Sequence, residues 1–528
     1  MTKVLVTDPI NQSGIEILSK VAQVDQHIGV SEEELKSLIG DYDALMIRSG
    51  TQVTSTVINS SAKLRIIGRA GVGVDNVDVE AATKRGVLVV NSPGGNTIAA
   101  AEHSIALMLA LSRNIPQAYI ATMNGTWERK KFVGNELFNK TLGIVGLGKI
   151  GSHVSKVANA FGMEVIAYDP FVSEERAQQM RVSLFSLDEI FAKSDYLTLH
   201  LPRTKETENL VNAKVFSKMK NNAKLVNCAR GGIIDELALA NALNEGQIGG
   251  AALDVFSEEP LSLDSPLLSV KKGLILTPHL GASTQEAQQN VAIDVAEQIR
   301  DVLLGLSART AVNIPGLSAE IMDSLKPHLQ LAETIGLLIG QLSGGKVKKL
   351  EVKLQGEFVQ HPSQPLVIAS LKGLLSQALG DKINYVNASL EANARGLEVV
   401  ELKDDARPDF ASGSLQLSIN GDNGYNSVAG TVFADGELRI ISIDQYPVNV
   451  SPSRFMLVTR HRDMPGIIGE LGSLLGKHNV NIASMQVGRK IVRGEAVMAL
   501  SIDDPIPNGL LDLILKIEGI NSAQSVTL

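Results

Sequence analysis

Three apolar runs in the middle of this 528-residue chain each end in an ionisable side chain. Arg230 lies in NCARGG, Glu259 in DVFSEEP and His279 in TPHLGAS. Ligands of an open parallel sheet bind beyond the carboxyl ends of its strands, so residues far apart in the chain can meet there. We expect these three side chains to converge on one ligand. The alternative for each is a structural role, as a turn arginine, a surface acid and a strand-end histidine.

Together the three side chains suit the oxidation of a secondary alcohol that stands beside a carboxylate. A histidine can take the hydroxyl proton as a hydride leaves the carbon. Glu259, on the far ring nitrogen, would fix the tautomer and stabilise the imidazolium. The Arg230 guanidinium can contact the substrate carboxylate and the developing carbonyl oxygen together. Nearby Cys228 is expected to be a small buried strand residue rather than a nucleophile, because no base lies close to it in sequence.

A glycine-rich turn at residues 141–151, TLGIVGLGKIG, has the spacing of a dinucleotide-binding loop. Gly146 permits the tight turn, Gly148 lets a pyrophosphate approach the backbone, and Gly151 lets the helix pack on its strand. The phosphates would lie at the helix N-terminus. Asp169 ends the next strand, where a carboxylate binds the ribose hydroxyls and repels a 2′-phosphate. The sequence thus predicts NAD rather than NADP, with a simple turn role for Asp169 as the alternative.

The elements that must position these residues alternate between short apolar runs and helix-length segments, which indicates parallel sheets. A buried helix at 96–114 leads into a second unit, and a long amphipathic helix from Thr284 leads out of it with no strand to follow. We therefore predict an α/β fold of two doubly wound parallel-sheet domains. A nucleotide domain, 96–285, is inserted into a first domain formed by 1–95 and 286–307.

The remaining chain predicts two further domains. Residues 316–452 form an α+β pattern of a long helix, a strand, a second helix and hairpin-like runs, without an acid–base cluster. Residues 453–528 follow the order βαββαβ.

Composition limits the possible partners. The net charge of −8 argues against a general nucleic-acid binder, which would use clustered positive charge to displace counterions from phosphates. A single cysteine cannot form an intramolecular disulfide, which fits a reducing compartment. The opening MTKVLVTDPI lacks the features of a leader, and the helix at 96–114 is too polar for a membrane span. We expect a cytoplasmic protein with no membrane segment and no metal site.

The stretches GIVGLGKIG, NCARGG, ALDVFSEEP and TPHLGAST resemble the signatures of the D-isomer-specific 2-hydroxyacid dehydrogenases. Nearly the whole chain resembles the long form within this family that acts on 3-phosphoglycerate. The resemblance implies NAD-dependent oxidation of 3-phosphoglycerate to 3-phosphohydroxypyruvate, the first step toward L-serine. It also implies that 316–452 is the family's intervening domain.

The resemblance assigns roles residue by residue. His279 matches the acid/base, Glu259 its partner and Arg230 the arginine that binds the substrate carboxylate. The residues matched to cofactor contacts are Gly146, Gly148, Lys149, Ile150, Gly151, Asp169, Pro202, Cys228, Ala229, Arg230, Asp254, His279 and Gly281. Those matched to the substrate are Arg48 and Ser49 in RSGT, Asn96 in GGNT, and Arg129 with Lys130 and Lys131 in WERKKF. The alternative for the basic triplet is a solvated run of charge.

The terminal βαββαβ segment resembles an ACT domain, a module that pairs with another copy and binds amino acids at the interface. Asp463 and Asn481 match positions that contact serine in regulated members, which implies L-serine as an effector. A purely structural pairing module is the alternative, since fold alone does not fix a ligand. Two-fold pairing indicates a homodimer or homotetramer.

Three rival functions remain at this stage. One is a dehydrogenase for glycerate, lactate or another D-2-hydroxy acid, although such relatives usually end after the bridging helix. The second is a non-catalytic NAD-sensing regulator like the C-terminal binding protein corepressors, but this chain lacks their partner-binding features. The third is an amino-acid sensor with a degenerate dehydrogenase domain, which the intact Arg230, Glu259 and His279 argue against.

Overall fold

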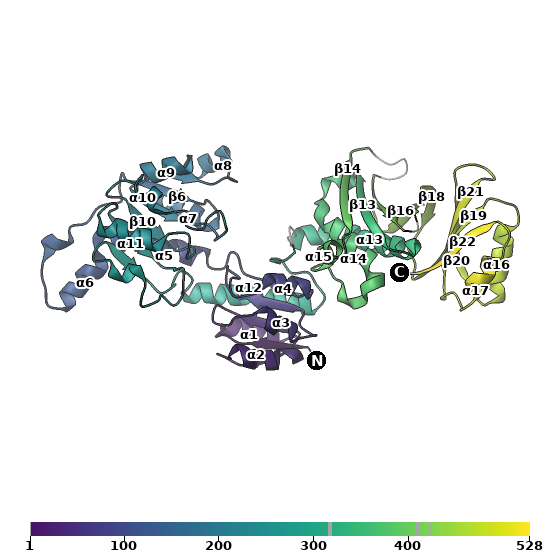
Figure 1. The fold of residues 1–528 in the computed structure, drawn as a ribbon, viewed down its shortest axis with the longest axis horizontal. Coiled ribbons are helices and arrows are strands. Elements are labelled where there is room, and N and C mark those ends of the chain that lie inside the picture. The colour runs from purple at the N-terminus through teal and green to yellow at the C-terminus, as the bar shows by residue number, and fades with distance from the viewer. Residues whose placement is uncertain (1, 315–318, 407–411, 423) are drawn as a thin grey trace.

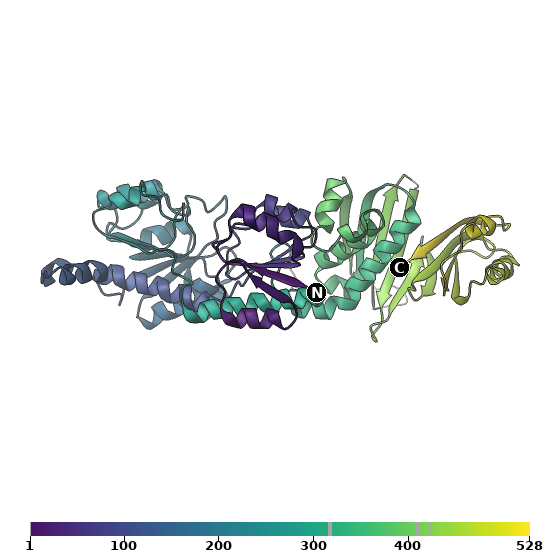
Figure 2. The same cartoon turned by 90° about the horizontal axis from the view of Figure 1, so that it is seen from below.

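The computed structural model describes residues 2–314, 319–406, 412–422 and 424–528. Four units lie one after another along an elongated molecule (Figure 1; Figure 2). The second unit of the chain occupies one end, and the first unit lies between it and the third. Within the described ranges no helix combines the length and the apolar character that crossing a membrane requires.

The first unit is a five-stranded parallel sheet with the order β2-β1-β3-β4-β5. Its strands are β1 Lys3–Val6, β2 Gln23–Gln26, β3 Ala44–Ile47, β4 Ile66–Arg69 and β5 Leu88–Val90, and its helices are α1 Gln12–Ser19, α2 Glu32–Leu38, α3 Ser55–Asn59 and α4 Val79–Lys84. The inner strands are apolar on both faces because helices cover both sides. β2 is not predicted from the sequence, because QVDQ is polar and the strand lies at the sheet edge.

The second unit is a seven-stranded parallel sheet with the order β12-β11-β10-β9-β6-β7-β8. Its strands are β6 Thr141–Val145, β7 Glu164–Tyr168, β8 Ser183–Leu184, β9 Tyr196–Leu199, β10 Lys224–Asn227, β11 Gly250–Leu253 and β12 Leu274–Leu276, and its helices are α7 Lys149–Ala160, α8 Glu174–Gln179, α9 Leu187–Lys193, α10 Ala213–Phe216 and α11 Glu236–Asn244. The strand order reverses between β6 and β9, which is the position where such sheets bind ligands. The predicted α/β class with two doubly wound sheets is confirmed.

Two long helices join these units. α5, Thr97–Arg113, leaves the first unit and buries Met108 in the core of the second. α12, Gln285–Leu303, returns and packs Val295 and Ile299 against the first sheet. The second unit is therefore inserted into the chain of the first unit. The exact domain boundaries near residues 95 and 286 stay predictions.

The third unit is a six-stranded sheet with the order β14-β13-β15-β16-β17-β18, packed against paired helices. Its elements are α13 Ala319–Ser343, β13 Val347–Gly356, α14 Ser363–Leu379, α15 Ala388–Ala394, β14 Glu398–Asp404, β15 Gly413–Gly421, β16 Gly424–Val432, β17 Leu438–Ile443 and β18 Tyr446–Val450. Three elements, β14, β18 and α15, are not predicted from the sequence. Both strands form sheet edges, where exposure removes the apolar signal.

The fourth unit has the predicted βαββαβ order and an antiparallel sheet β20-β21-β19-β22. Its elements are β19 Phe455–Arg462, α16 Ile467–Lys477, β20 Ile482–Arg489, β21 Glu495–Ile502, α17 Leu510–Ile514 and β22 Ile520–Thr527. Alternation along β19 sends Met456 and Val458 into the core of the third unit, while Leu457 packs under α16 and α17. The sheet thus joins the last two units through one core.

Two partly buried histidines of the third unit, His328 and His361, pack against each other. The His328 ring lies with its centroid 4.8 Å from that of Phe358 and 4.6 Å from that of His361. Its Nδ1 is buried and has no hydrogen-bond partner among the described residues. Burial, helped by the His361 charge and opposed by Glu357, lowers the pKa of His328 to about 4. The ring is therefore neutral in the folded protein at neutral pH.

We expect this pair to weaken the fold in acid. Because the folded pKa of His328 lies below its ordinary value, its contribution is complete above about pH 6.5 and is lost as the pH falls toward 4. The free energy of unfolding should decrease between roughly pH 7 and 5 by about 1–2 kcal/mol less in His328→Phe than in the unmodified protein. Calorimetric unfolding measures this difference. The exposed His27→Gln serves as a control. An unchanged pH dependence in His328→Phe contradicts the assignment.

Candidate active site

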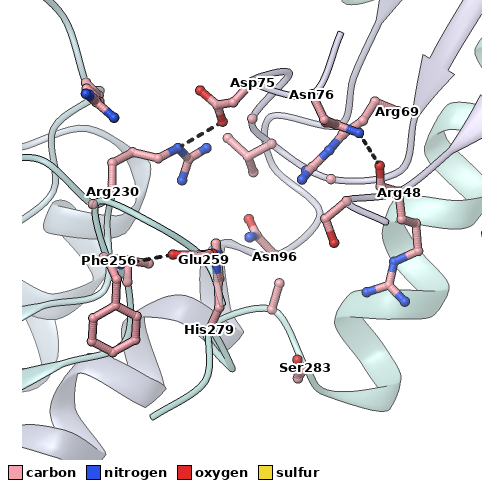
Figure 3. A pocket seen from close by; sticks show the side chains of 18 of the residues that line it. Arg48, Arg69, Asp75, Asn76, Asn96, Arg230, Phe256, Glu259, His279 and Ser283 are labelled. Carbon is pink, nitrogen blue, oxygen red and sulfur yellow. Dashed lines mark hydrogen bonds and ion pairs between the residues drawn. The ribbon is translucent and has the colours of Figure 1, made fainter. Parts of the chain in front are cut away.

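A cleft of about 630 Å³ opens between the first and second units (Figure 3). Its lining comes from the loops that follow β3, β4, β5 and β9 to β12, so the carboxyl ends of both sheets face the same space. Arg230, Glu259 and His279 all line it. The structure therefore brings together the three side chains that the sequence analysis connects.

The turn after β10 fixes Arg230. Asn227, the last residue of the strand, accepts the N–H of Ala229 at 3.0 Å and donates Nδ2 to the carbonyl of Arg230 at 2.9 Å. Gly231 is required because a Cβ there would lie 1.7 Å from a backbone oxygen. The guanidinium reaches across the cleft, where its Nε lies 3.4 Å from a carboxylate oxygen of Asp75 in the first unit (Figure 3).

His279 is paired with a carboxylate. Its Nδ1 lies 2.6 Å from Oε2 of Glu259, whose other oxygen accepts the N–H of Phe256 at 3.0 Å. Burial by itself raises the pKa of Glu259, but the hydrogen bonds from His279 and Phe256 outweigh it and hold the pKa below its ordinary value. Glu259 is thus ionised near neutral pH and favours a proton on Nδ1 of His279. Nε2 is left as the acceptor.

The turn that carries His279 is organised by Asp254, which is completely buried after β11. The Asp254 carboxylate accepts the N–H of Leu280 at 2.7 Å and of Gly281 at 2.8 Å. Its backbone carbonyl accepts the N–H of His279 at 2.9 Å. His279 has a φ of 54°, a left-handed conformation that costs roughly 1–2 kcal/mol for a residue with a Cβ. The contacts to Asp254 stabilise this conformation.

A second histidine, on α5, completes the surroundings of Asp254. His103 Nε2 lies 3.2 Å from Oδ1 of Asp254, and the Thr277 hydroxyl donates to the same oxygen at 2.6 Å. Burial alone would raise the pKa of Asp254. The hydrogen bonds from His103, Thr277 and the Leu280 N–H reverse that effect and hold the pKa below its ordinary value. A buried carboxylate needs these donors to remain charged.

Asp8 and Asn76 hold the loop RSGT, which is predicted to bind the substrate. Arg48 and Ser49 line the cleft from the first unit. Asp8 Oδ2 accepts the N–H of Arg48 at 2.6 Å and of Thr51 at 3.2 Å. Asn76 Nδ2 donates to the Arg48 carbonyl at 2.7 Å (Figure 3). The loop is therefore ordered by its own chain before any ligand binds.

Arg69 is a lining residue that the sequence analysis does not single out. Its Nε is buried without a hydrogen-bond partner in the described part of the chain, and so is Oδ1 of Asn96, another predicted substrate residue. Burial and the neighbouring charge of Arg230 lower the pKa of Arg69. A buried donor and a buried acceptor thus remain for a ligand. The strand-end argument used for Arg230 applies equally to RIIGR and would have found Arg69.

Arg129 does not reach this cleft. With Lys130 and Lys131 it forms an exposed turn beyond the carboxyl end of α5, since the Asn135 N–H donates to the carbonyl of Ser112 at 2.9 Å. Asn96 caps the opposite end of the 17-residue helix. About 25 Å of helix therefore separates the triplet from the cleft of its own chain.

The glycine turn has the geometry that a dinucleotide requires. Gly146 has a φ of 99°, and a Cβ there would lie 2.5 Å from a carbonyl oxygen. A Cβ on Gly151 would lie 2.0 Å from the Gly146 oxygen, whereas Gly148 faces open space at the start of α7. Asp169 Oδ2 accepts the N–H of Leu147 at 2.8 Å, which places the carboxylate beside the turn. These residues fit the pyrophosphate and ribose of NAD.

The other predicted cofactor residues lie at the same edge of the sheet. Lys149 and Ile150 begin α7, Pro202 follows β9, Cys228 and Ala229 follow β10, Asp254 follows β11, and Gly281 follows β12. Burial raises the pKa of the Cys228 thiol to about 12, so the sulfur is protonated at neutral pH. This agrees with the expectation that Cys228 is not a nucleophile, but the expected buried strand position is wrong, because Cys228 follows β10 and is only partly buried.

The predicted effector residues lie at opposite ends of the fourth-unit sheet. Asp463 follows β19 and accepts Nη1 of Arg489 at 2.6 Å, while Asn481 precedes β20 and donates to Asp503 at 2.7 Å. β19 and β20 both pair antiparallel with β21 and so run in the same direction. The eight-residue length of β20 therefore separates the two side chains by about 25 Å.

Comparison with known proteins agrees with this architecture. Residues 105–281 match the NAD binding domain of D-isomer specific 2-hydroxyacid dehydrogenases, residues 324–444 the D-3-phosphoglycerate dehydrogenase intervening domain, and residues 455–519 the ACT domain. The D-3-phosphoglycerate dehydrogenase of Synechocystis sp. is 58% identical over 529 residues, covering 100% of this chain and 95% of that protein. The one from Methanocaldococcus jannaschii is 44% identical and both chains are covered completely.

The fold also matches solved structures. The D-lactate dehydrogenase from Aquifex aeolicus, complexed with NAD and lactic acid, is 27% identical, with a TM-score of 0.52 over 58% of this chain and 96% of that chain. The fold and the cleft are thus those of an NAD-binding D-isomer-specific 2-hydroxyacid dehydrogenase, extended by two further domains. Full-length identity places the chain more narrowly, and it belongs to the D-3-phosphoglycerate dehydrogenase family.

We expect His103 to position the catalytic turn through Asp254. His103→Leu removes a hydrogen bond to a buried charge, worth about 1.5–3 kcal/mol. The amides of Leu280 and Gly281 should then exchange roughly 10- to 100-fold faster in hydrogen-exchange mass spectrometry. His103→Gln, which keeps an N–H donor, should restore most of the protection, and the exposed Glu102→Gln should have no effect. Equal protection in His103→Leu and the unmodified protein would disprove this coupling.

Proposed function

We propose that this chain oxidises 3-phospho-D-glycerate to 3-phosphohydroxypyruvate with NAD, the first step of L-serine synthesis. The observation that carries the proposal is the His279–Glu259 pair in one cleft with Arg230, Arg69 and Arg48. The names of the relatives that match along their full length support the same reaction.

The proton transfer follows from the protonation of the pair. Nε2 of His279 takes the proton of the substrate hydroxyl, and Glu259 stabilises the resulting imidazolium through Nδ1–H. Arg230 exchanges its long contact with Asp75 for the substrate carboxylate and steadies the developing carbonyl oxygen. Bound NAD supplies the acceptor for the hydride from C2. In the reverse direction His279 returns the proton to the oxygen.

The substrate phosphate is assigned to the first unit. Arg48 and Arg69 lie on this side of the cleft, and the buried Nε of Arg69 has no partner among the described residues. Oδ1 of Asn96, which has no hydrogen-bond partner among the described residues, would accept a hydrogen bond from a substrate hydroxyl. A phosphate brings two negative charges, which the positive charges of Arg48 and Arg69 can balance. Such local positive charge is needed because the protein as a whole is acidic.

The cofactor is assigned to the second unit. The amino end of α7 and the open space at Gly148 would hold the pyrophosphate, and Asp169 would bind the adenosine ribose hydroxyls. The carboxylate of Asp169 would repel the 2′-phosphate of NADP.

The arginines of the cleft bear on the rival functions. A dehydrogenase for lactate or glycerate has no phosphate to place against Arg48 and Arg69. A non-catalytic NAD sensor has no need of a histidine held at a φ of 54° against a carboxylate. We therefore rank both below the proposed reaction.

The working protein is proposed to be a cytoplasmic homodimer or homotetramer. The helix α6, Ile115–Met123, and residues 124–133 after it expose apolar side chains that a single chain leaves uncovered. Those more than half exposed are Ile115, Tyr119, Ile120, Met123, Trp127 and Val133. A second copy would cover this arm. If Arg129 serves the substrate, it does so in the cleft of that second copy, because its own cleft lies at the other end of α5.

Serine is proposed as an effector of the ACT domain. Asp463 and Asn481 lie about 25 Å apart within one chain. One serine molecule can therefore contact both only if Asp463 comes from one copy of the chain and Asn481 from another. The effector site would therefore form on pairing.

We expect purified protein with NADH to reduce 3-phosphohydroxypyruvate, and to reduce pyruvate far more slowly. His279→Asn should lower kcat by about 10²–10⁴-fold. Its affinity for NADH should stay within roughly threefold, since the nucleotide turn is untouched. NADH absorbance follows the reaction, and protein fluorescence follows binding. Retained turnover in the variant removes His279 as the base.

We also expect L-serine to inhibit this activity. Asp463→Ala deletes a hydrogen-bonding carboxylate and should raise the inhibitory concentration at least about tenfold. The exposed Asp512→Asn should behave like the unmodified protein. Kinetics that serine leaves unchanged would favour the purely structural pairing module instead.

A further inference from the structure

A second cleft, of about 530 Å³, lies between the first and third units. It sits at the amino ends of β4 and β5, on the edge of the sheet opposite the active-site cleft. Its floor is apolar, with Leu64 and Leu88 from the first unit and Leu329 and Ile368 from the third, all buried. No step of the proposed reaction uses this space.

Three cations line this second cleft, and none of its described lining residues is an aspartate or glutamate. Nη2 of Arg65 donates to the carbonyl of Val302 at 2.9 Å, and Nη2 of Arg85 donates to the carbonyl of Ser61 at 2.6 Å. Lys63 lies 3.8 Å from Asp41, outside the cleft. Neutral carbonyl oxygens thus orient the two guanidiniums, and neither guanidinium forms an ion pair with a carboxylate in the described part of the chain. In a chain of net charge −8, such a cluster attracts anions.

We propose that the second cleft binds a small oxyanion attached to an apolar body, such as a medium-chain carboxylate. The charged group would contact Arg65 and Arg85, and the apolar body would cover the leucine and isoleucine floor. The volume lies within the range of roughly 300–1,000 Å³ that is typical of small-molecule sites. The apolar wall comes from two units, so an occupant would hold them together.

Two rigid elements connect this site to the active site. Arg65 immediately precedes β4, and Arg69 ends it in the catalytic cleft, about 13 Å away along the strand. Val302 of α12 lines the second cleft, while Val291 of the same helix lines the first, about 17 Å along the axis. An occupant that shifts either element moves groups in both clefts, so binding should be coupled to the proposed substrate.

Binding is tested with the full-length chain and 8-anilinonaphthalene-1-sulfonate, a fluorescent sulfonate with an apolar body. Saturating NAD covers the nucleotide site and ionic strength is held constant. Octanoate should displace the probe, and inorganic phosphate at the same concentration should not. Arg65→Gln/Arg85→Gln should weaken the octanoate-sensitive binding at least tenfold. Ser307→Glu adds a carboxylate to the exposed wall without deleting a side-chain contact, and it should weaken binding in the same way.

The matched control is Arg176→Gln/Lys516→Gln, which removes two exposed cations far from the second cleft and should bind the probe normally. Probe affinity within twofold of the unmodified protein in both cleft variants would overturn the proposal. So would displacement by phosphate as effective as that by octanoate.

The coupling rests on the proposed function and is measured separately. Saturating octanoate should change KM for 3-phosphoglycerate by about fivefold or more, and Ser307→Glu should abolish the change. An unchanged KM overturns the coupling. The fluorescence titration needs no turnover, so a failure of the binding site is distinguished from a failure of the proposed reaction.

Discussion

The geometry around His279 depends on the buried carboxylate of Asp254 and the hydrogen bonds that it accepts. A completely buried charge is tolerated only if donors surround it, and here the donors come from two places: the turn after β12, which includes Thr277, and His103 on α5. The same contacts hold His279 in a left-handed conformation and bring its ring to Glu259. One electrostatic requirement therefore ties the helix between the domains to the proposed acid/base.

The course of the chain explains why both clefts exist. Leaving the first unit through α5 and returning through α12 places the carboxyl ends of two parallel sheets against each other, so charged loops from both face one space. The third unit then packs at the opposite edge of the first sheet and creates the second cleft. Because β4 and α12 run from one cleft to the other, the first unit is suited to carry a signal from the added domains to the substrate side.

Much of this follows from sequence because the rules involved are local or topological. Glycine spacing predicts the turn at Gly146, and the strand-end rule predicts the meeting of Arg230, Glu259 and His279. Polar edge strands such as β2 and β14 escape the apolar signal that marks inner strands. The same strand-end rule, extended to the first sheet, also marks Arg69. Only the family resemblance assigns Arg129 to the substrate, and no sequence pattern reveals that α5 separates it from the cleft of its own chain. The contact between His103 and Asp254 depends on packing between segments about 150 residues apart and has no sequence signature.

A crystal structure of the protein with NAD and 3-phosphoglycerate tests the proposed chemistry most directly. We expect the substrate hydroxyl within hydrogen-bond distance of Nε2 of His279, the carboxylate against Arg230, and the phosphate between Arg48 and Arg69. A substrate phosphate bound away from both arginines, or a hydroxyl out of reach of His279, would contradict the proposed chemistry.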